Sequence, residues 1–127
     1  AAFSVWGRES RCSDITIPLE LATEFDVTPP NIFKSFQLGQ PEAPRTLLKK
    51  AGFRKISTWY HSVPLPICAG KEFVRFISGM PFWKPLYAAL GEKVADFNIR
   101  LEEEAQKVLD KDKMIEFDNL GIIAYKQ

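Results

Sequence analysis

The sequence predicts an α/β fold, in which three short strands alternate with amphipathic helices. Ala1–Trp6 is an apolar run with little polar alternation, which is typical of a strand in a sheet that is covered on both faces. Arg54–His61 alternates with a period of two residues, and Leu120–Tyr125 is mostly apolar, so both are predicted strands. Helical periodicity occupies most of the sequence between them.

The composition describes an ordinary globular chain and excludes several classes of function. Of its 127 residues, 46% are hydrophobic and 26% charged. The net charge of +1 provides no long-range field for nucleic acid or an anionic membrane. There is neither an apolar run of about 20 residues nor a signal-peptide layout in Ala1–Gly7. Cys12 and Cys68 form neither a disulfide framework nor a metal-ligand spacing. We therefore expect a cytoplasmic protein without nucleic-acid, membrane or metal partners.

The predicted helices are delimited by proline and glycine. The first covers about Pro18–Phe25, with its proline in the first turn, and Val27–Asn31 ends it. A second helix opens at Pro41, carries an apolar stripe and stops at Gly52. The long segment Lys71–Leu109 is helical by pattern. The residues that interrupt this segment are Gly79, Pro81 and Gly91.

The first predicted strand is poorly protected as a sheet edge. Phe3 and Val5 point to one face, whereas Ala2, Ser4 and Trp6 point to the other, so neither face is polar. The strand has no Lys or Pro by which natural edges avoid pairing. We therefore expect another strand beside it, either from preceding sequence of a longer protein or from a second copy that self-associates through residues 1–6.

Three segments together resemble the carboxyl-terminal portion of a class I S-adenosylmethionine-dependent methyltransferase. The nearest subgroup is the broad one (methyltransferase type 11) that includes ubiquinone- and menaquinone-pathway enzymes. The order and spacing of the segments carry the resemblance, since no single motif is specific. The segments are Phe3-Ser4-Val5-Trp6-Gly7-Arg8, then Phe36-Gln37-Leu38-Gly39 followed by the Leu47–Ile56 run LLKKAGFRKI, and finally Ile122-Ile123-Ala124-Tyr125-Lys126.

The resemblance implies a single partial domain over residues 1–127, which is the carboxyl-terminal part of a Rossmann-like sheet. Its last strand, Leu120–Tyr125, is expected to lie antiparallel between Ala1–Trp6 and Arg54–His61. Residues 62–112 are expected to form a helical insertion that acts as a lid. The glycine-rich loop and the acidic residue that hold S-adenosylmethionine in this family are not in the sequence. The cofactor is therefore expected to bind the complete domain and not this chain alone.

Four aromatic residues are candidates for the walls of an acceptor pocket. Such sites are lined by apolar and aromatic side chains, although the same residues also fill protein cores. Both interpretations stay open at this point. The four residues are Trp6, Phe36, Trp59 and Trp83.

Two polar residues are also candidates for contact with the acceptor. Arg8 follows the first strand, where open α/β sheets place ligands. It could bind an anionic acceptor or lie on the surface. His61, the one histidine, could contact the acceptor or accept a proton, or could simply lead into a loop. Methyl transfer from a sulfonium is a displacement, so positioning matters most, and a base is needed only where the acceptor loses a proton. No residue is assigned a catalytic role.

These observations predict the acceptor-binding, carboxyl-terminal half of a methyltransferase that acts on a small molecule. Two alternatives from other classes remain open. One is a non-catalytic, methyltransferase-like module that pairs its sheet edge with another chain. The other is a binder of small hydrophobic ligands that uses the aromatic side chains.

Overall fold

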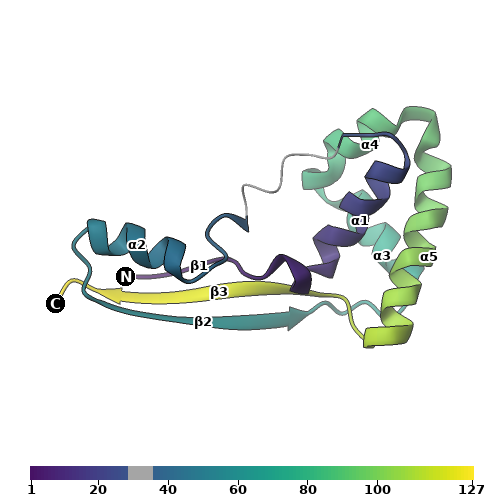
Figure 1. The fold of residues 1–127 in the computed structure, drawn as a ribbon. Helices are drawn as coiled ribbons and strands as arrows, with labels where there is room; N and C mark the ends of the chain where they lie inside the picture. Colours follow the sequence, from purple (N-terminus) through teal and green to yellow (C-terminus); the bar gives the residue numbers. More distant parts are fainter. Residues whose placement is uncertain (29–35) are drawn as a thin grey trace. The chain divides into compact units, whose positions relative to one another are not determined.

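The computed structural model describes residues 1–28 and 36–127, and it has an α/β fold. Figure 1 shows the course of the chain. The strands are β1 (Ala2–Trp6), β2 (Lys55–Pro64) and β3 (Glu116–Tyr125). The α-helices are α1 (Ser13–Glu24), α2 (Glu42–Lys50), α3 (Gly70–Gly79), α4 (Lys84–Leu90) and α5 (Val94–Asp112). Short 3-10 helices are η1 (Glu9–Arg11), η3 (Pro81–Trp83) and η4 (Gly91–Lys93).

The described residues form two compact units. The sheet unit contains the three strands, η1 and α2, and comprises residues 1–12, 36–63 and 116–127. The helical unit contains α1, α3, α4 and α5, and comprises residues 13–28 and 64–115. Helices α3 to α5 therefore follow β2 and precede β3 in the chain, within the segment that the sequence marks as a helical insertion. The membership of α1 in this unit is not apparent from the sequence.

The sheet has the order β1-β3-β2, so the last strand is central. Strand β1 is antiparallel to β3, in a register that pairs Phe3 with Ile122. Strand β2 is also antiparallel to β3, because the Arg54 N–H donates to the Tyr125 carbonyl (2.8 Å) at one end, and the Leu65 N–H donates to the Ile115 carbonyl (2.8 Å) at the other. The predicted three-stranded arrangement, with the last strand antiparallel and central, is confirmed.

Helix α2 covers one face of the sheet, and this face is the buried one. Alternate residues of β3 point to it and are buried: Asp118, Leu120, Ile122 and Ala124. The Arg45 guanidinium of α2 donates to the Thr58 hydroxyl of β2 (2.9 Å), which places the helix over this face. The predicted apolar stripe of α2, Leu47, Leu48 and Ala51, is not its buried face. Leu47 is 55% exposed, Ala51 is exposed and Leu48 is half-buried, whereas the buried residue of α2 is Pro44.

The helical unit is built around the apolar stripe of α5. Phe97, Leu101 and Ala105 are fully buried there. Helix α3 approaches α5 closely at Gly70, because a side chain at this position would run into the Glu102 carbonyl oxygen. The rest of this core comes from α3, η3 and α4: Phe73, Ile77, Trp83, Leu86 and Leu90.

The predicted helix boundaries hold in part. The interruption before Pro81 is confirmed, since Met80 is extended, and so is the one at Gly91, whose φ of 53° favours glycine. The predicted start of the first helix at Pro18 is wrong. Helix α1 begins at Ser13 and Pro18 lies inside it, so tertiary packing outweighs the hydrogen bond that a proline removes. The helix ends at Glu24, and the Pro29–Asn31 part of the predicted break lies outside the described residues.

The predicted second and third strands are both too short. Strand β2 continues beyond His61 as far as Pro64, and β3 begins at Glu116, before the predicted start at Leu120. Polar residues in the added part of β3 obscured it in the sequence, since Glu116, Asp118 and Asn119 break the apolar pattern. Glu116 and Asp118 pair with Arg11 and Arg8, which lie far away in the sequence, and the strand pattern does not indicate this pairing.

Candidate functional site

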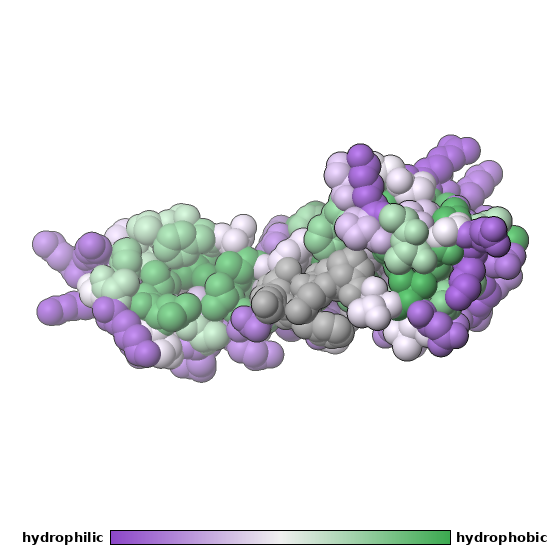
Figure 2. Space-filling view, turned by 90° about the horizontal axis from the view of Figure 1, so that it is seen from above, coloured by the Kyte–Doolittle hydropathy of each residue, from purple (hydrophilic) through white to green (hydrophobic). Residues whose placement is uncertain are grey.

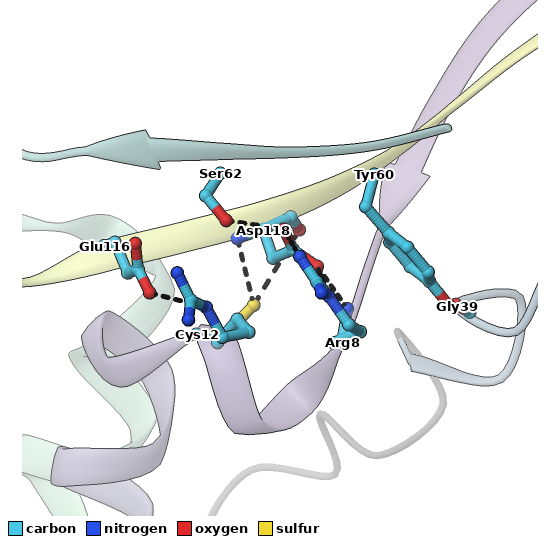
Figure 3. A network of polar contacts seen from close by, with 8 residues as sticks. Arg8, Cys12, Gly39, Tyr60, Ser62, Glu116 and Asp118 are labelled. Atoms are coloured by element: carbon cyan, nitrogen blue, oxygen red, sulfur yellow. Dashed lines mark hydrogen bonds and ion pairs between the residues drawn. The ribbon is translucent and has the colours of Figure 1, made fainter. Parts of the chain in front are cut away.

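The carboxyl end of β1 meets a fully buried carboxylate, that of Asp118 in β3. One carboxylate oxygen accepts hydrogen bonds from the Arg8 Nε (2.8 Å) and from the Arg8 backbone N–H (2.8 Å). The other accepts from the Arg8 Nη2 (3.2 Å) and from the Ser62 hydroxyl (2.9 Å). Figure 3 shows how these groups converge from β2, β3 and the segment that follows β1. We call this arrangement the Asp118 cluster.

The Asp118 cluster holds its carboxylate in the charged form. Burial by itself raises the pKa of Asp118, but the hydrogen bonds from Arg8 and Ser62 and the charge of Arg8 outweigh it and lower the pKa to about 2. The hydrogen bond to Asp118 in turn raises the pKa of Arg8. This pair is therefore ionised at every pH at which proteins normally work.

Arg8 is held on a second side by an aromatic ring. Its guanidinium lies 4.4 Å from the centroid of the Tyr60 ring, within cation–π range. The Tyr60 hydroxyl donates to the Gly39 carbonyl oxygen (2.8 Å). The Arg8 side chain is still 40% exposed. The structure thus fixes the orientation of Arg8 while leaving part of it open to solvent.

The backbone around Arg8 is tightly packed, which requires two glycines. A Cβ at Gly7 would lie 2.6 Å from an oxygen of Asp118, and a Cβ at Gly39 would run into the Gly7 carbonyl oxygen. Next to them, the buried Cys12 thiol lies 3.3 Å from the Asp118 backbone nitrogen, which donates to it. Larger residues at either glycine would therefore displace the end of β1 or the loop before α2.

Two of the residues predicted from the sequence, Trp6 and Phe36, are in contact at this end of β1, and a third, Arg8, follows it. Trp6 packs edge-on against Phe117, with ring centroids 5.9 Å apart. Its ring centroid lies 6.2 Å from that of Phe36. Arg8 follows two residues later. The structure therefore brings Trp6 and Phe36 together. The register pairs Trp6 with Asn119, so the Trp6 side chain lies on the face of the sheet opposite to the Asp118 carboxylate that Arg8 binds.

Trp59 and His61 lie on the opposite face of β2 from Tyr60 and Ser62, because side chains alternate along a strand. There they line a shallow hollow of about 550 Å³ over all three strands. The Trp59 indole lies directly on Gly121, where a Cβ would run into the ring. The two residues thus belong to a different surface from the Asp118 cluster.

Trp83, the last aromatic candidate, belongs to the helical unit. It is 1% exposed and packs edge-on against Phe82, with ring centroids 5.1 Å apart. In that unit it is a core residue.

The cluster also contains residues that the sequence analysis did not single out: Gly39, Tyr60, Ser62 and Asp118. A signal for Asp118 was present. The spacing of Asp118, Leu120 and Ile122 has the period of two that marks one face of a strand. Extending β3 to Glu116 would have placed an acidic residue on the buried face, where a charged group needs a partner.

The residues that the structure describes contain no group of three or more His, Cys, Asp or Glu side chains that could hold a metal ion. In the same part of the chain, no helix has both the length and the apolar character needed to cross a membrane. In the Asp118 cluster, the carboxylate of Asp118 and the guanidinium of Arg8 neutralise each other.

The fold and the cluster define an α/β chain with an open, three-stranded antiparallel sheet and a polar cluster at the carboxyl end of its first strand. Comparisons with family models, curated proteins and solved structures give no significant match.

Proposed function

We propose that this chain forms the acceptor-side, carboxyl-terminal half of an S-adenosylmethionine-dependent methyltransferase domain that acts on a small molecule. The observation that carries the proposal is the strand order, in which β3 is inserted antiparallel between β1 and β2. The family that the sequence resembles implies this arrangement. Helical connections between strands usually make neighbouring strands parallel. An antiparallel strand between β1 and β2 is therefore uncommon in a sheet whose strands are connected by helices.

The contact between Trp6 and Phe36 and the partly exposed guanidinium of Arg8 support a role in holding the acceptor. Open α/β sheets bind ligands beyond the carboxyl ends of their strands, and β1 ends here. A methyl transferase mainly positions its acceptor, so rigid aromatic surfaces are suitable groups. In this proposal Trp6 and Phe36 contact the acceptor. The exposed part of the Arg8 side chain contacts the acceptor as well. Asp118 fixes the orientation of Arg8 and makes the net charge of the pair zero.

The described residues do not fit a binding site for S-adenosylmethionine. Such a site needs successive backbone N–H groups in a glycine-rich turn. The glycines at the sites of close packing are engaged elsewhere, with Gly7 against Asp118, Gly70 against α5 and Gly121 beneath Trp59. The proposal therefore assigns cofactor binding to other sequence of a complete domain, and only acceptor contact to this chain.

Calorimetric titration with S-adenosylmethionine tests the proposal. We expect the natural protein that contains this chain to bind the cofactor with micromolar affinity, and the 127-residue chain alone not to bind it. Transfer of a labelled methyl group to a small-molecule fraction should accompany binding by the natural protein. A natural protein that neither binds the cofactor nor transfers the label would overturn the proposal.

A second candidate function rests on the hollow over the sheet. At about 550 Å³ it has the size of a small-molecule site, although it is open. Trp59 is 47% exposed there, with His61 and Asn119 as polar neighbours. A binder of small, planar hydrophobic ligands would use this indole as a stacking surface. Titration with a hydrophobic dye should then quench Trp59, and Trp59→Ala should abolish the binding. A dye that binds both proteins equally would exclude this site.

A further inference from the structure

We propose that the chain forms a symmetric dimer in which β1 pairs antiparallel with β1 of a second copy, centred on Phe3. The proposal concerns the 127-residue chain and rests on the backbone and side chains of β1 and α2. A preceding strand of a longer protein would take the same edge, so such a pairing and the dimer exclude each other. The sequence predicts self-association through residues 1–6 but not the register of the two strands. The proposal specifies that register.

The hydrogen bonds to β3 determine which backbone groups of β1 remain available. The amino group of Ala1 donates to the Ala124 carbonyl (2.7 Å), and the Ala124 N–H donates to the Ala1 carbonyl (2.8 Å). At the other end, the Gly7 N–H donates to the Asp118 carbonyl (2.7 Å). In an antiparallel pair every second residue bonds to the neighbour. Odd-numbered residues of β1 therefore face β3.

The even-numbered residues direct their N–H and C=O groups away from β3, towards the edge of the sheet. Strand β1 is the outermost strand of the described sheet on this side. The edge is obstructed at Trp6, because Gly39 lies so near that a Cβ there would be 3.0 Å from the Trp6 carbonyl oxygen. Ala2 and Ser4 therefore provide the accessible groups.

Symmetry then selects one register. A twofold dimer requires that residue i contacts residue j while j contacts i. If the two strands are centred on Phe3, Ala2 lies opposite the second copy's Ser4, and Ser4 lies opposite the second copy's Ala2. Each of these two residue pairs then exchanges two backbone hydrogen bonds. A pair centred on Ser4 would instead require the crowded carbonyl of Trp6. The Phe3-centred register is the one that uses the accessible groups and avoids the obstruction.

The side chains at this edge are suitable for burial against a second copy. Phe3 is 43% exposed and would lie directly opposite the second copy's Phe3, where aromatic pairs stabilise sheets. Leu47 is 55% exposed. It lies roughly 200° around α2 from Arg45, whose guanidinium reaches β2. Figure 2 shows apolar side chains gathered on the sheet unit.

Apart from the obstruction at Trp6, the residues of β1 have no feature that opposes pairing. Residues 2–6 carry no charge, proline or bulge, which are the devices that protect natural edges. The contact is short, and it buries less than the roughly 1,200 Å² of a standard interface. We therefore expect a weak dimer that forms at high micromolar concentration.

Cysteine cross-linking tests the register. In the Phe3-centred dimer the two Phe3 Cα atoms form a non-hydrogen-bonded pair about 4.5 Å apart, which is within the range that a disulfide spans. In a Cys68→Ser background, which removes the exposed thiol, Phe3→Cys should form a cross-linked dimer under mild oxidation. Val5→Cys is the matched control on the same face. It lies opposite Ala1 of the second copy and should not cross-link.

Sedimentation tests the association itself. The mass should rise from 14.5 kDa towards twice that value as the concentration reaches several hundred micromolar. Ser4→Pro removes an outward N–H that β3 does not use and should weaken the dimer more than tenfold, whereas Ser4→Ala should not. A chain that stays monomeric, or a Val5→Cys variant that cross-links as fast as Phe3→Cys, would overturn the proposal. The cross-linking experiment does not use Ser4→Pro, so it still tests the dimer if that variant misfolds.

Discussion

Asp118 and Asp14 are both buried, but their surroundings have opposite effects on their protonation. Asp118 accepts hydrogen bonds from Arg8 and Ser62, and its pKa is lowered to about 2. Asp14 lies in the first turn of α1, and its Oδ1 has no hydrogen-bond partner among the described residues. Burial raises the pKa of Asp14 to about 7, although backbone N–H groups act in the other direction. The two carboxyl groups should therefore affect stability in different pH ranges.

Asp118→Asn should lower the free energy of unfolding by about 1–3 kcal/mol at neutral pH, because Arg8 would lose its charged partner. In the native protein this contribution is present above the ordinary carboxyl pKa of 3.8 and is lost as the pH falls towards about 2. Urea unfolding at several pH values measures both effects. Glu103→Gln, which breaks an exposed ion pair with Arg100, is the control and should change stability little.

Asp14 should make the protein less stable as the pH rises from about 4 to about 7. The folded state keeps its proton over that range while the unfolded state releases it, so stability is greatest below the ordinary pKa of 3.8. The total change should be about 2–4 kcal/mol. Asp14→Asn should remove this slope, which thermal melts at pH 4, 6 and 8 would measure. An unchanged slope in the variant would mean that Asp14 is ionised in the folded protein.

Helix α5 holds the helical unit together through one face. Phe97 is fully buried and packs edge-on against Phe25 and Tyr87, with ring centroids 5.6 and 5.8 Å away. Two residues further along, Ile99 is 59% exposed. The same helix thus provides a buried and an exposed apolar position for comparison.

Phe97→Ala should lower the free energy of unfolding by about 3–5 kcal/mol, because it leaves a cavity in the core. Ile99→Ala should change it by less than about 0.5 kcal/mol. Denaturant unfolding followed by circular dichroism at 222 nm provides the measurement. Similar losses in the two variants would show that the assigned buried face of α5 is wrong.

At the scale of the whole molecule, β3 should be the segment best protected from amide hydrogen exchange. It lies between β1 and β2, and Leu120 and Ala124 are fully buried. A central strand exchanges only when the sheet opens, whereas edge strands open locally. Mass spectrometry of peptic fragments should therefore show slower exchange in residues 116–125 than in residues 2–6. The reverse order in a monomer would contradict the strand order.

Much of the fold was predictable because its signals are local. The apolar run of β1, the alternation of β2 and the glycine and proline residues that interrupt the helices appear directly in the sequence. The start of α1 was not predictable from the sequence. Ser13 and Asp14 resemble a polar loop, and a proline such as Pro18 usually marks the first turn of a helix. Of the site candidates, Trp6 and Phe36 come together, Arg8 binds Asp118 instead, and Trp83 is in the core of the helical unit.

The sequence by itself determined the α/β class, the approximate strand positions and the interruptions of the long helical segment, because periodicity and backbone preference act over a few residues. Only the tertiary structure decided that Arg8 meets Asp118 across 110 residues of chain. It also decided that Trp59 and His61 lie on the opposite face from Tyr60. These relations depend on which strands are neighbours and in which register they pair, and a shift of one residue would turn each of these side chains to the other face.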